Sequence, residues 1–356
     1  MKKSGFRAWI TAAGCWLLLF YIAGTLISLL TLYTIPVTEG LGIDRASFSL
    51  VFTMYSLVSA VISFFFFKIL NKLSLRLAIL IGGIAAGVGY LLFSIAQSAA
   101  LLWVGGALLG VALGLCGLLS VQLVLTNWFA KRTGFIITLS SAFTGAGALI
   151  MSPVIGKIIS AYGWRTSFRI SGLIAVALTT VVTIFMIRDH PKELNMLPYG
   201  ADTADMKDAS AEKNSGKATD VPGVSMKEAV TSVKFWIVMF CLAIIGFNLQ
   251  VGVSQQSAMI MDKGFTLEAA AAIISVYAIF NAVTKIFAGI AIDKFGVRII
   301  AAVASVLQII SLGFMLMGTT RIHMIIYAVL FGASVCVSVN YGILAIPMLF
   351  GKKELK

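Results

Sequence analysis

Ten long apolar stretches separated by short polar segments make up most of this 356-residue chain. A helix that crosses a bilayer needs about 20 mostly apolar residues, and each stretch is long enough. The stretches do not alternate apolar and polar positions, as the strands of a membrane barrel would. We therefore predict an all-α membrane protein with ten transmembrane helices. The predicted helices occupy residues 8–34, 48–67, 76–96, 101–127, 134–156, 167–187, 235–260, 269–291, 299–318 and 323–349.

One long polar segment, residues 188–234, interrupts this pattern. It is rich in Asp, Lys, Ser, Ala and Gly and too poor in apolar residues to fold alone, which indicates a flexible linker. The chain therefore divides into an N-terminal six-helix bundle at 1–187, the linker, and a C-terminal bundle at 235–356 with four helices.

Composition and charge narrow the class of protein. With 60% hydrophobic and 12% charged residues, the chain cannot cover a soluble enzyme of this size with polar surface. The net charge of +13 does not indicate a nucleic-acid partner, because the basic residues lie in alternate loops. Twenty of the 27 Lys and Arg residues fall on the side of the N-terminus and the linker, and six on the other side. We expect a plasma-membrane protein with both termini and the linker in the cytoplasm.

The four cysteines lie inside apolar runs without metal-site spacing, so no metal or cofactor is expected. An internal repeat relates the two sides of the linker, since residues 71–76 resemble residues 293–298 at an offset of 222. Parallel repeats about an axis normal to the membrane are one way in which transporters are built, with rocking of one bundle against the other.

The second copy of this repeat resembles the signature G-x-x-x-D-(R/K)-x-G-x-(R/K) of the major facilitator superfamily. The matching residues are Gly289, Asp293, Lys294, Gly296 and Arg298. An Asp at a helix terminus and a Gly that permits a tight turn are the physical content of the signature. In the first copy Phe67, Asn71 and Ser74 replace the first Gly, the Asp and the second Gly, which weakens the expectation of an inter-bundle charge contact there.

Four further segments, 33–47, 127–134, 163–165 and 347–352, are similar to the oxalate/formate antiporter and monocarboxylate transporter branch of this superfamily. The resemblance covers essentially the whole chain. It implies the major facilitator fold of two six-helix bundles and secondary active transport of small mono- or dicarboxylates such as oxalate, formate, lactate or pyruvate. The expected partners are the lipid bilayer and this substrate, bound by a monomer.

Lys285 is the most informative single residue. It lies eight residues before Asp293, or about 12 Å along a helix, and so near the middle of a hydrocarbon core about 30 Å thick. A charge there costs at least about 2.5–3.5 kcal/mol, and no Asp or Glu lies well inside any predicted helix to pair with it. Snorkelling to the interface is one interpretation. Binding of an anionic substrate is the other, and the branch resemblance implies it.

Tyr277 and Asn281 share one helix face with Lys285, at spacings of four residues. In proton-coupled members of the branch an acid occupies the position four before the cation. Asn281 cannot be protonated in this way, so anion exchange or facilitated diffusion is favoured over proton symport.

By resemblance, the first, fourth, seventh and tenth helices line the central cavity. Their candidate substrate-binding residues are Tyr21, Thr25, Gln122, Asn248, Gln255, Asn340 and Tyr341. Hydrogen bonding between helices is the competing use of these side chains. The Gly106, Gly110 and Gly114 ridge indicates close helix packing. The segment 152–156 only partly resembles an antiporter signature.

Two alternatives to a carrier remain to be weighed, a membrane-embedded enzyme and a non-transporting relative. A membrane-embedded enzyme would need clustered acids or histidines, but His190 and His323 fall on opposite sides of the membrane. A non-transporting relative that acts as a sensor or scaffold is not excluded. The repeat offset of 222 places two further helices near 356–378 and 389–409, so we expect a truncated twelve-helix carrier whose full form would reach about 410 residues. We expect the present chain to insert into the membrane but to transport poorly or not at all.

Overall fold

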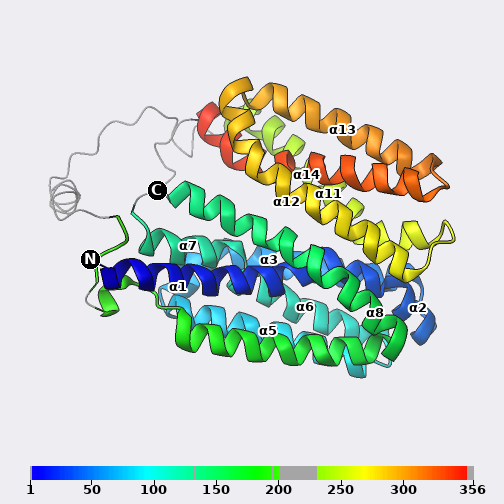
Figure 1. The fold of residues 1–356 in the computed structure, drawn as a ribbon, viewed down its shortest axis with the longest axis horizontal. Helices are drawn as coiled ribbons and strands as arrows, with labels where there is room; N and C mark the ends of the chain where they lie inside the picture. Colours follow the sequence, from blue (N-terminus) through cyan, green and yellow to red (C-terminus); the bar gives the residue numbers. More distant parts are fainter. Residues whose placement is uncertain (1, 131–132, 195, 201–230, 351–356) are drawn as a thin grey trace.

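The computed structural model describes residues 2–130, 133–194, 196–200 and 231–350 (Figure 1). The side chains of Lys285, of residues 336–350 and of the signature loop apart from Gly296 lie outside this description, as do residues 201–230 of the predicted linker.

The N-terminal half is a succession of helices. They are α1 (Lys2–Leu18), η1 (Leu19–Ala23), η2 (Thr25–Leu29), η3 (Leu30–Tyr33), α2 (Thr34–Leu41), α3 (Arg45–Phe64), α4 (Phe66–Leu70), α5 (Leu75–Ile95), α6 (Ala99–Cys116), α7 (Leu118–Trp128), α8 (Thr133–Val181), η4 (Val182–Met186) and the short η5 (Pro191–Leu194). Gly163, with φ of 79° and ψ of 163°, breaks α8 into two helical arms, and the predicted helices 134–156 and 167–187 lie on either side of it.

The C-terminal half contains α11 (Val233–Met261), α12 (Leu267–Phe295), α13 (Val297–Met317) and α14 (Arg321–Phe350). Each predicted transmembrane segment therefore coincides with helix, which confirms the all-α fold class. Among the described residues, six helices are long and apolar enough to cross a membrane, and Leu139–Met186 contains the break in α8.

Local sequence explains where several helices begin. Asp44 precedes α3, and its carboxylate accepts a hydrogen bond from the Ser47 amide at 3.0 Å; the hydrogen bonds from Ser47 hold the pKa of Asp44 below its usual value. Ser74 caps α5 through the Leu77 amide. Gly296 adopts a φ of 81° between α12 and α13, so the turn expected from the signature forms as predicted.

Small residues set the packing inside the N-terminal half. A Cβ at Gly106 or Gly110 would meet the backbone of α3 at Val51 or Tyr55, and one at Gly114 would meet Ile62. The predicted close packing of this ridge is confirmed, because only glycine lets the two backbones approach so near.

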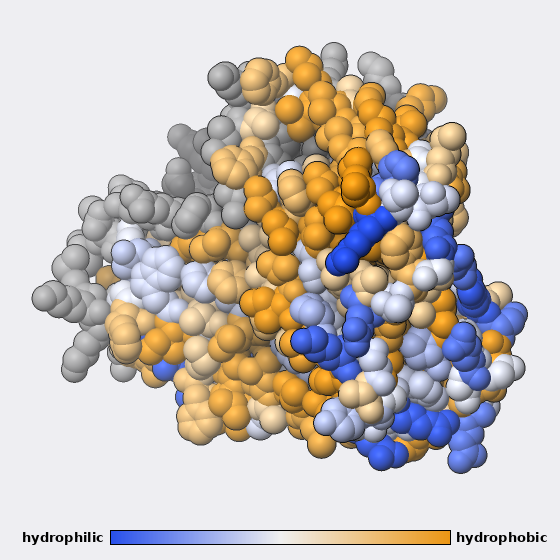
Figure 2. All heavy atoms as spheres, turned by 45° about the vertical axis from the view of Figure 1, so that its right-hand side comes forward, coloured by the Kyte–Doolittle hydropathy of each residue, from blue (hydrophilic) through white to orange (hydrophobic). Residues whose placement is uncertain are grey.

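The two halves lie side by side (Figure 1). We call the right-hand end of that view the α2 end and the left-hand end, where the start of α1 and residues 187–194 lie, the linker end. Figure 2 shows orange, hydrophobic side chains over the helix flanks and blue, hydrophilic ones gathered at the α2 end. This division of the surface suits a protein whose flanks contact lipid and whose end contacts water.

Candidate functional site

A cavity of about 310 Å³ lies between the two halves of the molecule. Its described lining is mostly apolar, with hydroxyl and amide groups at a few positions and no charged side chain. The lining residues are Ala23, Ile27, Ser28, Ser63, Leu113, Leu118, Leu119, Ser141, Thr144, Gly145, Leu249, Gln250, Val253, Tyr277, Asn281 and Val335. A concave, largely apolar site with a few converging polar groups is the usual form of a small-molecule binding site.

The C-terminal half contributes the pair Tyr277 and Asn281, one turn apart on α12. Both are buried, at 2% and 7% exposed, and the Asn281 Nδ2 donates to the Tyr277 hydroxyl at 3.3 Å. The Asn281 Oδ1 has no hydrogen-bond partner among the described residues. Tyr277 is held by stacking on Phe331 of α14, with ring centroids 5.5 Å apart. The structure thus brings two of the predicted site residues together on one cavity wall.

Polar contacts between α3 and α11 close one side of the cavity. Beginning at the lining, the Gln250 Nε2 donates to the Tyr55 hydroxyl at 2.7 Å. Farther toward the α2 end the Gln255 Nε2 donates to the Ser49 Oγ at 2.9 Å. The two helices run antiparallel here, so the contacts involve lower residue numbers on α3 and higher residue numbers on α11 toward the α2 end. We call this row of contacts between the halves the α3–α11 seam.

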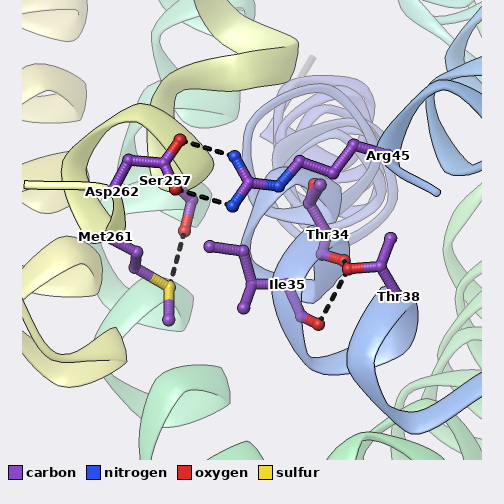
Figure 3. Close-up of polar contacts among 7 residues, drawn as sticks. All are labelled: Thr34, Ile35, Thr38, Arg45, Ser257, Met261 and Asp262. Carbon is purple, nitrogen blue, oxygen red and sulfur yellow. Dashed lines mark hydrogen bonds and ion pairs between the residues drawn. The ribbon is translucent and has the colours of Figure 1, made fainter. Parts of the chain in front are cut away.

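An ion pair completes this seam at the α2 end (Figure 3). Arg45, the first residue of α3, donates from Nη1 and Nη2 to the two carboxylate oxygens of Asp262 at 2.5 and 2.6 Å. The two side chains are 49% and 48% exposed. The hydrogen bonds from Arg45 hold the pKa of Asp262 below its usual value. Beside the pair, the Ser257 amide donates a hydrogen bond to the Thr31 Oγ1 of the N-terminal half at 3.2 Å.

A second seam joins α8 to α12. The Ser152 Oγ donates to the Ala271 carbonyl at 2.7 Å, and a Cβ at Gly156 would come 2.9 Å from the Ala271 Cβ. Nearer the cavity a Cβ at Gly145 would come 2.9 Å from the Ala282 Cβ. The segment 152–156, which partly resembles an antiporter signature, therefore supplies small residues to this interface. Gln250 and Gly145 line the cavity, so each seam begins at the cavity and its other contacts lie toward the α2 end.

The remaining sequence candidates fall elsewhere. The Tyr21 hydroxyl donates to the Ser171 carbonyl, and the Thr25 hydroxyl contacts Tyr90, so both are engaged within the N-terminal half. Gln122 is half-buried on α7 outside the described lining. Asn248 is exposed and donates to the Ile244 carbonyl of its own helix. Gln255 belongs to the seam between α3 and α11. The side chains of Lys285, Asn340 and Tyr341 lie outside the described residues.

Five polar lining residues were not among the sequence candidates: Ser28, Ser63, Ser141, Thr144 and Gln250. Gln250 shares a helical face with the lining residue Val253, whereas Asn248 lies about 200° away around α11 at 100° per residue. Helix rotation is set by packing, so the choice between them required the structure. The described residues contain no cluster of His, Cys, Asp or Glu that could hold a metal ion.

The first signature copy has a role within its own half. Arg76 donates from Nε to the Thr183 carbonyl and from Nη2 to the Ile184 carbonyl, both at 2.8 Å. Its amide donates to the Asp189 carboxylate at 2.7 Å. Burial raises the pKa of Asp189. These contacts tie the start of α5 to the end of η4 at the linker end.

Comparisons with known proteins agree with this architecture. The family profile described as Major Facilitator Superfamily matches residues 12–351. Monocarboxylate transporter 12 of Rattus norvegicus is 28% identical over 143 residues, or 40% of this chain and 28% of that protein. Membrane sensor protein UhpC of Salmonella typhimurium is 24% identical over 260 residues, or 71% of this chain and 57% of the sensor. The chain thus spans little more than half the length of the sensor and about a quarter of the transporter.

Among solved structures, that of the nucleoside transporter NupG is similar, with a TM-score of 0.69 at 11% identity over 96% of this chain and 82% of that one. At this identity the likeness concerns the fold alone.

Proposed function

Because this chain belongs to the major facilitator superfamily, we propose that it carries small organic carboxylates across the plasma membrane by alternating access, with exchange favoured over proton symport. The superfamily consists of multi-pass membrane transporters, so secondary transport is the starting point. The substrate class, the coupling and the orientation with both termini in the cytoplasm are the proposal.

The observation that carries the proposal is a cavity between the two halves from which both seams extend toward the α2 end. A carrier that rocks its halves needs its binding site at their interface and contacts that can form on one side of the site at a time. In the proposed orientation the α2 end faces outside, so both seams extend from the cavity toward the outer side.

The position of Lys285 supports an anionic substrate. It follows Asn281 by one turn on α12, toward the linker end, and no acidic residue lies well inside any of the helices. A cation at this depth without a fixed counter-charge is stabilised when a carboxylate enters the cavity. Similarity to monocarboxylate transporter 12 supports the same class of substrate.

The polar groups of the described cavity wall favour exchange over proton symport. Proton symport requires a group in the site that binds and releases a proton. The described lining offers amides and hydroxyls. By resemblance to the branch, Asn281 stands where an acid precedes the cation in proton-coupled members.

Counterflow in proteoliposomes tests this proposal. Vesicles that contain the purified chain and an excess of unlabelled carboxylate should transiently accumulate the labelled acid, without a response to an imposed pH gradient. Accumulation that requires an inward proton gradient would contradict exchange. Absence of any carboxylate counterflow, in a preparation that binds carboxylates, would favour the second candidate.

That second candidate is a membrane sensor which binds its ligand without carrying it. The similarity to membrane sensor protein UhpC favours it, because this match covers 71% of the chain. A sensor would show saturable carboxylate binding and a ligand-dependent change at the linker end, with no flux.

A further inference from the structure

Three arginine side chains meet at the C-terminal end of η4, at the linker end of the N-terminal half (Figure 1). The Arg7 Nη2 donates to the Phe185 carbonyl at 3.0 Å. The neighbouring Ile184 carbonyl accepts two hydrogen bonds, from the Arg76 Nη2 at 2.8 Å and from the Arg188 Nη1 at 3.1 Å. The three guanidinium groups therefore gather around two adjacent carbonyl oxygens, although they come from α1, α5 and the segment after η4.

The charges of this arginine cluster are not balanced by the groups around it. The carbonyl end of a helix carries about half a unit of negative charge, whereas the cluster carries three positive charges. Among the described residues, none of the three arginines forms an ion pair with a carboxylate. Asp189 directly follows Arg188, but its carboxylate accepts from the backbone amide of Arg76. The like charges of Arg188 and Arg76 both oppose that of Arg7, so an anion at this position would be stabilised.

Each arginine also keeps a terminal nitrogen for a further partner. The Nη1 atoms of Arg7 and Arg76 and the Nη2 of Arg188 donate to no described residue, and none of these three atoms is enclosed by the protein. Planar guanidinium groups bind phosphate oxygens through paired, charge-assisted hydrogen bonds. The cluster therefore offers donors of the kind that phosphate groups select.

Apolar side chains border the cluster on the flank of the molecule. Phe6 precedes Arg7 and is 71% exposed, and Phe185, which supplies one of the two carbonyls, is 67% exposed. Val181, one turn before Phe185, is exposed as well. Acyl chains would cover this apolar surface, whereas a free phosphate ion would leave it in contact with its surroundings unchanged. A phosphate group that carries hydrocarbon chains thus fits the cluster and its border together.

We propose that Arg7, Arg76 and Arg188 form a binding site for the headgroup phosphate of an anionic phospholipid in the leaflet at the linker end. Basic pockets between helices at a membrane surface bind acidic headgroups in this way. The bound phosphate relieves the repulsion among the three cations and connects the starts of α1 and α5 to the end of η4. None of the three arginines lines the cavity, so this lipid site is separate from the proposed substrate site.

Native mass spectrometry of the full chain in detergent tests the inference without requiring transport. The protein is titrated with phosphatidylglycerol or with phosphatidylcholine of the same acyl chains, and phosphatidylglycerol is then challenged with inorganic phosphate at the same concentration. We expect phosphatidylglycerol to bind about fivefold or more tightly than phosphatidylcholine and to resist displacement by inorganic phosphate. Equal binding of the two lipids would overturn the site. Displacement by inorganic phosphate would overturn the assignment to a lipid.

Variants locate the site. One basic residue near a membrane surface corresponds to about a fivefold change in affinity for an anionic headgroup. Arg7→Gln and Arg188→Gln should therefore each raise the dissociation constant of phosphatidylglycerol about fivefold and leave that of phosphatidylcholine nearly unchanged. Arg188→Lys, which keeps the charge without the planar fork, should lose less affinity than Arg188→Gln.

Lys68→Gln is the matched control, because it removes one positive charge from an exposed side chain on α4, shortly before the turn into α5. We expect the control to bind phosphatidylglycerol as the wild type does. A loss of affinity as large in Lys68→Gln as in the two arginine variants would indicate diffuse attraction to basic residues and overturn the site. The comparison of lipids on the wild-type chain decides the matter even if one variant fails to fold.

Discussion

Removing the ion pair at the α2 end should release the two halves from each other. Arg45 and Asp262 belong to different halves, and their fork-to-fork contact is the outermost member of the α3–α11 seam (Figure 3). Arg45→Ala removes the guanidinium group that donates hydrogen bonds to the Asp262 carboxylate. The double variant Arg45→Asp with Asp262→Arg restores an attractive pair with the charges exchanged.

The magnitude follows from exposure. Both side chains are about half exposed, at 49% and 48%, so water screens their attraction, and an exposed pair contributes about 0.2–1 kcal/mol. The bidentate geometry favours the upper limit of about 1 kcal/mol. This free energy corresponds to about a fivefold change in the ratio of molecules whose halves are in contact at the α2 end (closed) to molecules whose halves are separated there (open). Salt at about 1 M should remove most of this difference, because the Debye length falls to about 3 Å.

Electron–electron distance measurements provide the assay, with spin labels at Glu39→Cys and Thr266→Cys, both exposed near this end, and the four native cysteines replaced. We expect Arg45→Ala to increase the population with longer distances and the charge-exchanged double variant to restore the original distribution. An unchanged distribution in Arg45→Ala, or a double variant that behaves like the alanine variant, would refute the role of the pair.

The pH dependence of the same contact has a defined sign. Arg45 lowers the pKa of Asp262, so the pair's contribution is fully present above the unperturbed aspartate value of about 3.9 and is lost as the pH falls through the lowered value. The closed population should therefore be constant between about pH 5 and 8 as far as this pair is concerned.

Three further predictions concern separate parts of the molecule. Lys285→Ala should abolish carboxylate binding and Lys285→Arg should retain part of it; unchanged affinity in the alanine variant would assign Lys285 to snorkelling. A cysteine at Gly200 should resist an impermeant thiol reagent in intact cells, and labelling there would reverse the proposed orientation. Gly147→Ala should lower the free energy of unfolding by about 1–3 kcal/mol, because its Cβ would collide with the Phe20 carbonyl, whereas Gly246→Ala, with nothing within 4 Å, should not destabilise the protein in thermal or denaturant unfolding.

The positions of the helices could be predicted from hydropathy alone. In a bilayer every backbone polar group must be satisfied internally, so a long apolar run has no alternative to helix. The turn at Gly296 and the close packing of Gly106, Gly110 and Gly114 were likewise predictable, because each depends on a property of glycine itself. The assignment of Tyr277 and Asn281 to one helix face needed only their spacing.

What the sequence by itself determined, then, was the set of helices, the spacing of residues along each helix and the family signature. The tertiary structure decided which polar side chains meet across the two halves. Asn248, Gln250 and Gln255 are equally polar and lie within eight positions on α11, yet Asn248 is exposed, Gln250 lines the cavity and Gln255 joins the seam. The pairing of Arg45 with Asp262, 217 positions apart, depended on the same arrangement. Rotation and docking of a helix are set by the summed packing of both halves, so no local pattern could specify these contacts.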